Sequence, residues 1–247
     1  MSNFLRCAGF GELDGRGFLG QHEVQGAGLL EFGGGGFEDD VDVFGYERVT
    51  QGGLGLRLVL VLQRLLVDGG LAAGVLAEGV VRPLHLLRAG GLEDFGDAVR
   101  IKPVAGPLRR INVKTMPYPG YPTDMNPQIA VLLCLAQGTS ILTEGVWDTR
   151  FKYVEELTRM GASITVDGRK AVIEGGKPLK PATVKCSDLR AGAAMVIAAL
   201  ATEGETIIEN IYHIERGYEH LVEKLSGAGA DIKKIYVPDT NTASKAI

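Results

Sequence analysis

The chain has 247 residues, of which 45% are hydrophobic and 23% charged, a balance typical of a protein with one sizeable core or two small ones. Its formal net charge of −4 provides no general attraction for nucleic acid or for an anionic membrane. The three cysteines lie far apart without metal-ligand spacing, so we expect no metal site, and a reducing cytoplasm suits them best.

The composition changes sharply near Arg110. Residues 1–110 hold 23 of the 35 glycines but only one lysine and one isoleucine, whereas residues 111–247 hold ten lysines and thirteen isoleucines. Apolar residues before the change come in Leu/Val runs without a helical or strand period, so we expect no recognisable fold there. Two explanations stay open: a poorly ordered glycine-rich domain, or a stretch translated from the wrong frame or strand, which we favour.

Two further signals in the first part are weak. Gly15, Gly17 and Gly20 have the spacing of a dinucleotide-binding turn, but no strand precedes them and no amphipathic helix follows, so we assign no cofactor. The most apolar stretch, roughly residues 54–81, is interrupted by charges that are costly in a bilayer. The first residues lack a basic region followed by an apolar core. We therefore expect neither a membrane span nor a secretory signal.

Residues 111–247 contain an internal repeat of one α/β unit. An apolar helix followed by a glycine and a short β-branched strand starts at Ile129 and again at Met195. A second pair of matching segments starts at Val154 and Val222, which gives a repeat spacing of 66 to 68 residues. Each unit is predicted as helix, strand, helix, strand, with helices packed on a sheet. Free N–H groups at the helix starts favour a phosphate-bearing ligand.

Four polar clusters stand where a loop changes to a helix. Asp124 and Asp188 can each cap the helix that follows, a role worth about 1 kcal/mol for an aspartate. Arg150 and Arg216 can each be a solvated charge on a helix face, which for a single arginine is as good an interpretation as a functional one. Because arginines and aspartates recur at equivalent edges of both units, we predict one site that binds an anionic substrate and moves a proton.

Four segments of the second part carry a resemblance to a known family: YPGYPTDMNPQ, TEGVWDTRFKYVEELTRMGA, VKCSDLRAGAAMVIAAL and IYHIERGYEHLVEKLSGAGADI. In order and spacing they resemble the UDP-N-acetylglucosamine 1-carboxyvinyltransferases, which are enolpyruvyl transferases, over nearly all of residues 111–237. The resemblance implies an α/β (α+β) fold, an inside-out repeat domain with about two βαβα-type repeats. It leaves residues 238–247 as a flexible tail.

The same resemblance implies an activity. The family transfers the enolpyruvyl group of phosphoenolpyruvate to the 3′-hydroxyl of UDP-N-acetylglucosamine in peptidoglycan precursor synthesis, in the cytoplasm and without a metal or organic cofactor. Asp124 matches the proposed base at that hydroxyl, and Asp188 matches an aspartate that handles protons. Val146 matches a position whose backbone holds the UDP-sugar. Arg150 matches an arginine near the substrate, and Arg190 and Arg216 match arginines that contact phosphoenolpyruvate.

The largest departure from the family lies in residues 1–110. No motif there matches the family's reactive cysteine loop, its N-terminal lysine or its further arginines. Cys134 and Cys186 are predicted as core residues, and His213 is expected to hydrogen-bond locally. We therefore expect an inactive fragment of low stability, because repeats bury their cores on neighbours. Two alternatives stay open: the shikimate-pathway sibling transferase, and a non-catalytic remnant that binds a uridine nucleotide or a partner chain.

Overall fold

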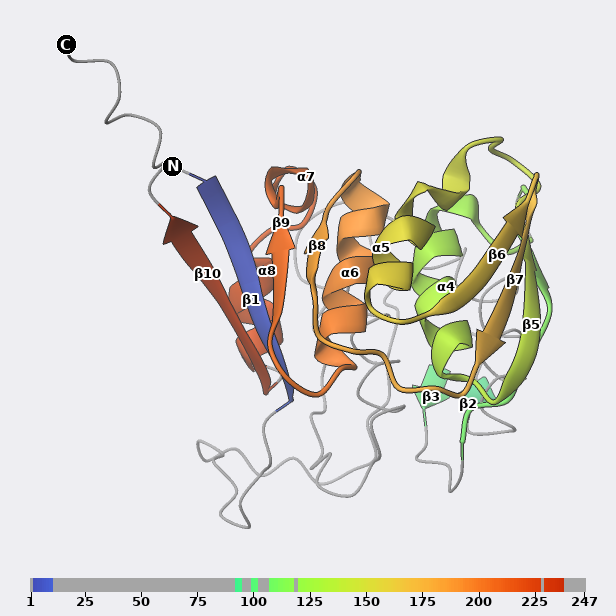
Figure 1. Ribbon diagram of the computed structural model, residues 1–247, viewed down its shortest axis with the longest axis horizontal. Helices are drawn as coiled ribbons and strands as arrows, with labels where there is room; N and C mark the ends of the chain where they lie inside the picture. Colours follow the sequence, from blue (N-terminus) through green and yellow to red (C-terminus); the bar gives the residue numbers. More distant parts are fainter. Residues whose placement is uncertain are drawn as a thin grey trace.

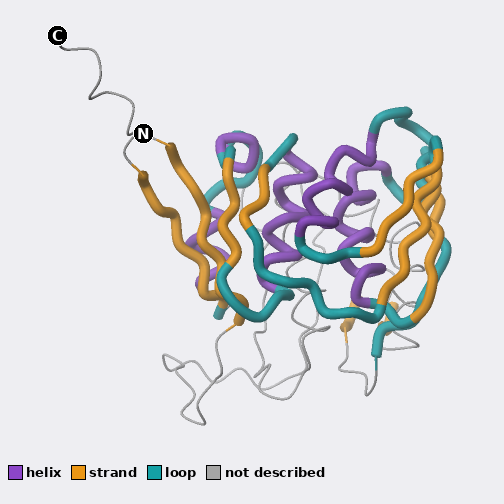
Figure 2. Tube along the Cα trace, viewed as in Figure 1, coloured by secondary structure: helices purple, strands orange, loops and turns teal. Residues whose placement is uncertain are grey.

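The computed structural model describes residues 2–10, 92–94, 99–101, 107–117, 120–227 and 229–237. These residues form two four-stranded sheets with helices packed between them (Figure 1). Figure 2 shows the same arrangement, with helices in the middle and strands on either side. The predicted α/β repeat architecture with helices inside and sheets outside is confirmed. No helix in the described part of the chain has both the length and the apolar run needed to cross a membrane.

The first unit supplies one sheet and the helices beside it. Its elements are β4 (Val113–Lys114), η2 (Thr123–Met125), α4 (Asn126–Leu135), β5 (Gly138–Thr143), η3 (Arg150–Tyr153), α5 (Val154–Arg159), β6 (Ser163–Asp167) and β7 (Lys170–Gly175). Strands β5 and β7 alternate between buried and exposed residues. The alternation buries one face of the sheet against the helices and leaves the other face outward.

The second unit repeats this plan. Its elements are β8 (Thr183–Lys185), α6 (Leu189–Leu200), β9 (Thr206–Glu209), α7 (Tyr212–Glu215), α8 (Leu221–Gly227) and β10 (Ala230–Val237). A separate antiparallel pair is formed by β2 (Leu92–Asp94) and β3 (Val99–Ile101).

The two large sheets have the same strand order and the same directions. One sheet has the order β4-β5-β7-β6 and the other the order β8-β9-β1-β10. In each, the first two strands are parallel, and the third lies antiparallel between the second and the fourth. The repeat predicted from the sequence is therefore visible in the strand pairing itself.

Strand β1 (Ser2–Phe10) takes the place in the second sheet that β7 takes in the first (Figure 1). Leu5 and Cys7 point into the core and are 2% and 0% exposed. This finding differs from the boundary predicted at Arg110, which left all of residues 1–110 outside the folded domain. A short alternation of apolar and polar residues in a glycine-rich stretch does not reveal such a strand. Residues 11–91 and 238–247 lie outside the described residues, and the prediction for them stays a prediction.

Replacing Leu5 with alanine tests whether β1 belongs to the cooperative unit. The side chain is buried between sheet and helices, so we expect Leu5→Ala to lower the free energy of unfolding by about 2 kcal/mol. Urea denaturation followed by circular dichroism measures the change. The control is Arg6→Ala, because Arg6 forms an exposed ion pair with Glu205 and should contribute under about 1 kcal/mol. Equal effects of the two substitutions would mean that β1 unfolds independently.

The centre of the molecule is formed by α4 and α6, which are buried along nearly their whole length. Small residues allow other elements to approach α6 closely. A Cβ added to Gly192 would lie 2.6 Å from Ile214 of α7, and one added to Gly217 would lie 2.8 Å from Leu189. Glycine at these two positions therefore brings the end of α7 against the start of α6, where the charged residues gather.

Candidate functional site

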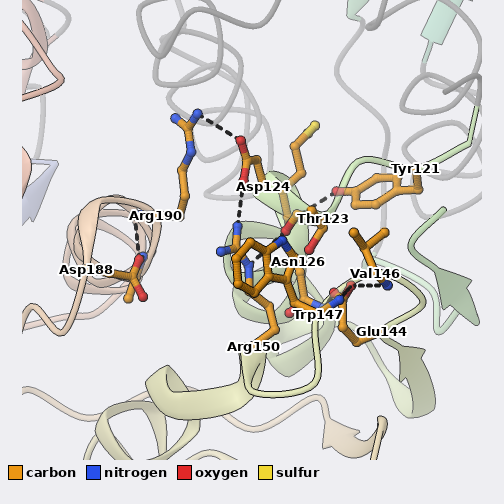
Figure 3. A network of polar contacts seen from close by, with 12 residues as sticks. Tyr121, Thr123, Asp124, Asn126, Glu144, Val146, Trp147, Arg150, Asp188 and Arg190 are labelled. Carbon is orange, nitrogen blue, oxygen red and sulfur yellow. Dashed lines mark hydrogen bonds and ion pairs between the residues drawn. The ribbon is translucent and has the colours of Figure 1, made fainter. Parts of the chain in front are cut away.

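The start of α4 and the start of α6 are joined by an aspartate that pairs with two arginines (Figure 3). Arg150 Nη2 donates to Asp124 Oδ1 at 2.8 Å, and Arg190 Nη2 donates to Asp124 Oδ2 at 3.1 Å. Arg150 Nε also donates to the carbonyl oxygen of Thr123 at 3.1 Å. Asp124 comes from the first unit and Arg190 from the second, so this network links the two repeats.

The two aspartates predicted as helix caps behave differently. Asp188 caps α6, because its Oδ1 accepts hydrogen bonds at 2.8 Å from the backbone N–H groups of Arg190 and Ala191. The 3₁₀ turn η2 that contains Asp124 has no side-chain capping bond. The carboxylate of Asp124 instead accepts hydrogen bonds from the two arginines, so of the two aspartates only Asp188 is a helix cap.

A pocket of about 300 Å³ opens beside this network. It is lined by Trp147, Thr149, Arg150, Lys152, Asp188, Leu189, Arg190 and Arg216. Four cationic side chains and one carboxylate in one small pocket favour an anionic ligand, and guanidinium groups suit a carboxylate or a phosphate in particular. Asp124 contacts two of the lining arginines, and the structure thus places four of the predicted residues in one lining: Arg150, Asp188, Arg190 and Arg216. Val146, also predicted, does not line this pocket.

Two arginines of the pocket, Arg150 and Arg190, are held in place by hydrogen bonds to other residues. The side chains of Arg150 and Arg190 are 16% and 15% exposed. Arg190 Nη1 donates to the hydroxyl of Tyr218 at 3.2 Å. Burial alone would lower the pKa of Arg190, but Tyr218 and Asp124 raise it above its usual value, so the guanidinium stays charged. Arg150 is therefore not the solvated surface charge that remained an alternative for it, whereas Arg216 lines the pocket but is exposed, so for Arg216 both interpretations stay open.

Glu144 is the functional candidate that the sequence reasoning missed. It is 1% exposed, and its Oε1 accepts hydrogen bonds from the backbone N–H groups of Val146 at 2.8 Å and Trp147 at 3.1 Å. Its Oε2 accepts from Asn126 Nδ2 at 2.8 Å, and the hydroxyl of Tyr153 donates to Asn126 Oδ1 at 2.6 Å. Figure 3 shows Asn126, Glu144, Val146 and Trp147 beside Arg150.

The charge of Glu144 is stabilised by dipoles. Burial works to raise the pKa of Glu144, but hydrogen bonds from the Thr115 side chain and from the backbone of Val146 and Trp147 outweigh it and lower the pKa. The Val146 side chain is 41% exposed, while its N–H is used by Glu144. A backbone contact from Val146 to a ligand would therefore use its carbonyl oxygen.

The three cysteines provide no nucleophile to the pocket. Cys7, Cys134 and Cys186 are all buried, and burial raises the pKa of each thiol to about 12. The expectation that Cys134 and Cys186 are core residues is confirmed. His213, expected to hydrogen-bond locally, stacks on Tyr212 with ring centroids 4.0 Å apart, and its Nδ1 has no hydrogen-bond partner among the described residues. Within the same residues, no group of three or more His, Cys, Asp or Glu could hold a metal.

Comparison with known proteins decides the family. A family model described as EPSP synthase (3-phosphoshikimate 1-carboxyvinyltransferase) matches residues 92–225. A UDP-N-acetylglucosamine 1-carboxyvinyltransferase from Desulfofundulus thermocisternus is 41% identical over 246 residues, which cover 94% of this chain and 90% of that protein. The chain belongs to the carboxyvinyltransferase family. These enzymes are enolpyruvyl transferases, so the resemblance predicted from the motifs is confirmed.

Other carboxyvinyltransferases match the chain over a part of their own length. UDP-N-acetylglucosamine 1-carboxyvinyltransferase 3 of Caldanaerobacter subterraneus is 52% identical over 144 residues, which cover 58% of this chain and 34% of that protein. The chain thus spans about a third of the length of this curated relative. Among solved structures, the enolpyruvyl transferase NikO from Streptomyces tendae aligns with a TM-score of 0.57 at 30% identity, over 74% of this chain and 45% of that chain.

Proposed function

We propose that this chain carries the part of an enolpyruvyl transferase site that binds phosphoenolpyruvate and receives the 3′-hydroxyl of UDP-N-acetylglucosamine. The proposal rests on one observation: three arginines from both repeats line a single pocket, and two of them contact Asp124. Two of the relatives named for this acceptor are 41% identical over 246 residues and 52% identical over 144 residues. The role would lie in peptidoglycan precursor synthesis in the cytoplasm.

The donor side of the proposed site is the arginine cluster. Phosphoenolpyruvate has a carboxylate and a phosphate, and Arg150, Arg190 and Arg216 offer guanidinium forks for both. During transfer, the acceptor oxygen bonds to the enol carbon and the bond from that carbon to the phosphate oxygen breaks, which releases phosphate. Positive charge around the phosphate stabilises the leaving group. Asp188 borders the same pocket, and because its Oδ1 holds the helix cap, Oδ2 is the oxygen suited to exchange a proton.

The acceptor side of the proposed site is Asp124. Its side chain is 43% exposed, so a hydroxyl can reach the carboxylate and transfer its proton to it. A volume of about 300 Å³ is small for a ligand site and suits phosphoenolpyruvate alone. The nucleotide part of the acceptor would therefore lie across the open side, next to Trp147 and the carbonyl of Val146.

We expect the isolated chain to bind both substrates without turning them over. Calorimetric titration with phosphoenolpyruvate and with UDP-N-acetylglucosamine measures binding, and a phosphate-release assay measures turnover. Shikimate 3-phosphate distinguishes the sibling enzyme, and tighter binding of it than of the nucleotide sugar would reverse the acceptor assignment. Failure of phosphoenolpyruvate to bind would refute the donor site. Robust phosphate release would show that residues outside the described ranges supply catalytic groups.

A further inference from the structure

Glu144 is a buried carboxylate to which the proposed mechanism assigns no role. Its carboxylate accepts three hydrogen bonds from protein N–H groups, two on Oε1 and one on Oε2. Each of the donors belongs to a segment that contributes to the candidate site. Breaking any of these hydrogen bonds would leave a buried charge with fewer partners, which costs free energy. The carboxylate therefore holds the segments that donate to it in fixed positions.

The segments joined by Glu144 carry the main parts of the site. Asn126 is the first residue of α4 and directly follows η2, which contains Asp124. Tyr153, which donates to Asn126, ends η3, the element that begins with Arg150. The N–H groups of Val146 and Trp147 belong to the loop between β5 and η3. One carboxylate thus connects the aspartate, the first-unit arginine and the loop.

Trp147 provides the aromatic side chain of this loop. It is 59% exposed although it lines the pocket beside three arginines. An aromatic ring at the mouth of an anion pocket offers a flat apolar surface on which a ring of a nucleotide sugar can stack. The backbone that carries the ring is held in place, because the Trp147 N–H donates to Glu144 Oε1 at 3.1 Å.

We infer that Glu144 is a positioning residue, which holds Trp147 so that its ring contacts the nucleotide-sugar acceptor while the arginines bind the anion. The inference rests on the proposed function for the identity of the acceptor. Glutamine leaves at least one donor without an acceptor, because its NH₂ group would face either Asn126 Nδ2 or the two backbone N–H groups. Turning the Asn126 amide over to accept from that NH₂ group would take the acceptor from the Tyr153 hydroxyl. A donor facing a donor breaks the connection at one of its ends.

The test uses the full chain and its single tryptophan, Trp147, as a fluorescent reporter. We expect Glu144→Gln to weaken binding of UDP-N-acetylglucosamine about tenfold and to change binding of inorganic phosphate by less than about twofold. Fluorescence anisotropy decay of the tryptophan should show a larger amplitude of local motion. The matched control is Glu156→Gln, because Glu156 also accepts a backbone N–H, that of Lys185 at 3.0 Å, away from the pocket.

A second variant separates positioning from a general loss of stability. In the double variant Glu144→Gln with Asn126→Asp, the new amide donates to the new carboxylate, and Tyr153 still has an acceptor. We expect this pair to restore nucleotide-sugar affinity to within about threefold of the natural chain and to restore the anisotropy. Equal losses of phosphate and nucleotide-sugar binding, or no recovery in the double variant, would overturn the inference. If the natural chain binds no nucleotide sugar, the acceptor proposal fails, while the anisotropy still decides whether Glu144 holds the loop.

Discussion

Replacing Arg190 with alanine is expected to weaken phosphoenolpyruvate binding about 100-fold, since a charge-assisted hydrogen-bond pair to a partly buried anion is worth about 2 to 3 kcal/mol. Arg190 lines the pocket, lies 3.1 Å from Asp124, and is oriented by Tyr218 at 3.2 Å. It therefore brings a fixed guanidinium to the ligand without a large cost of ordering it. Calorimetric titration of the Arg190→Ala chain with phosphoenolpyruvate measures the loss.

Two controls define what this result means. Arg190→Lys keeps the charge but loses the planar fork, so we expect an intermediate loss of about tenfold. Arg159→Ala removes the same charge from an exposed side chain, which pairs with Glu156 at 3.5 Å and does not line the pocket, so the change should stay below about twofold. If Arg190→Ala and Arg159→Ala weakened binding equally, net charge rather than the pocket would attract the anion.

The repeat could be predicted because matching residues have matching local conformations. Gly138 and Gly204, which follow the two apolar helices, have φ values of +100° and +98°. Gly161 and Gly229, which precede the next strands, have φ values of +86° and +88°. Positive φ is a local requirement that glycine meets without a side-chain clash, so the sequence shows it directly.

The partner of strand β1 could not be predicted in this way. Its neighbours β9 and β10 lie about 200 residues further along the chain. The nine residues of β1 contain no signal that specifies which sheet this strand joins. Strand β7 was missed for a different reason. Asp167 ends β6 and pairs with Lys170 of β7, so the two strands are joined by the two-residue turn Gly168-Arg169. Gly168 has φ +55°, and a glycine at the first position of such a turn is a hairpin signal that the helix-strand repeat does not include.

Much of the site follows from the repeat. Asp124 and Arg190 are 66 residues apart, which equals the repeat spacing, so the pair joins equivalent positions of the two units. Arg150 and Arg216 also occupy equivalent positions, and both line the pocket. The recurrence of arginines and aspartates in both units therefore predicted one shared site, while the role of each residue in it was implied by the family resemblance and stays a prediction. The recurrence could not predict Glu144, because a buried carboxylate that is bound by backbone N–H groups has the same sequence appearance as a surface acid.

Asp124 and an anionic substrate compete for the same guanidinium groups. Replacing Asp124 is therefore expected to strengthen substrate binding, whereas replacing Arg190 is expected to weaken it. Asp124 is the counter-ion of both Arg150 and Arg190. Asp124→Asn removes one negative charge within a few ångströms of the bound anion, worth about 2 kcal/mol at an intermediate dielectric. We expect phosphoenolpyruvate affinity to rise about 30-fold. The gain should shrink in high salt, because Asp124 is partly exposed.

The matched control for this prediction is Asp148→Asn. Asp148 lies in the same loop as Trp147, is 76% exposed and pairs with Arg169 rather than with a pocket arginine, so its loss should change the affinity by less than about twofold. Titrations at low and high ionic strength compare the two variants. A fall in affinity for Asp124→Asn would mean that the aspartate chiefly holds the arginines in place. A rise would show that it competes with the substrate, so that binding of phosphoenolpyruvate itself releases the carboxylate to accept a proton from the acceptor hydroxyl.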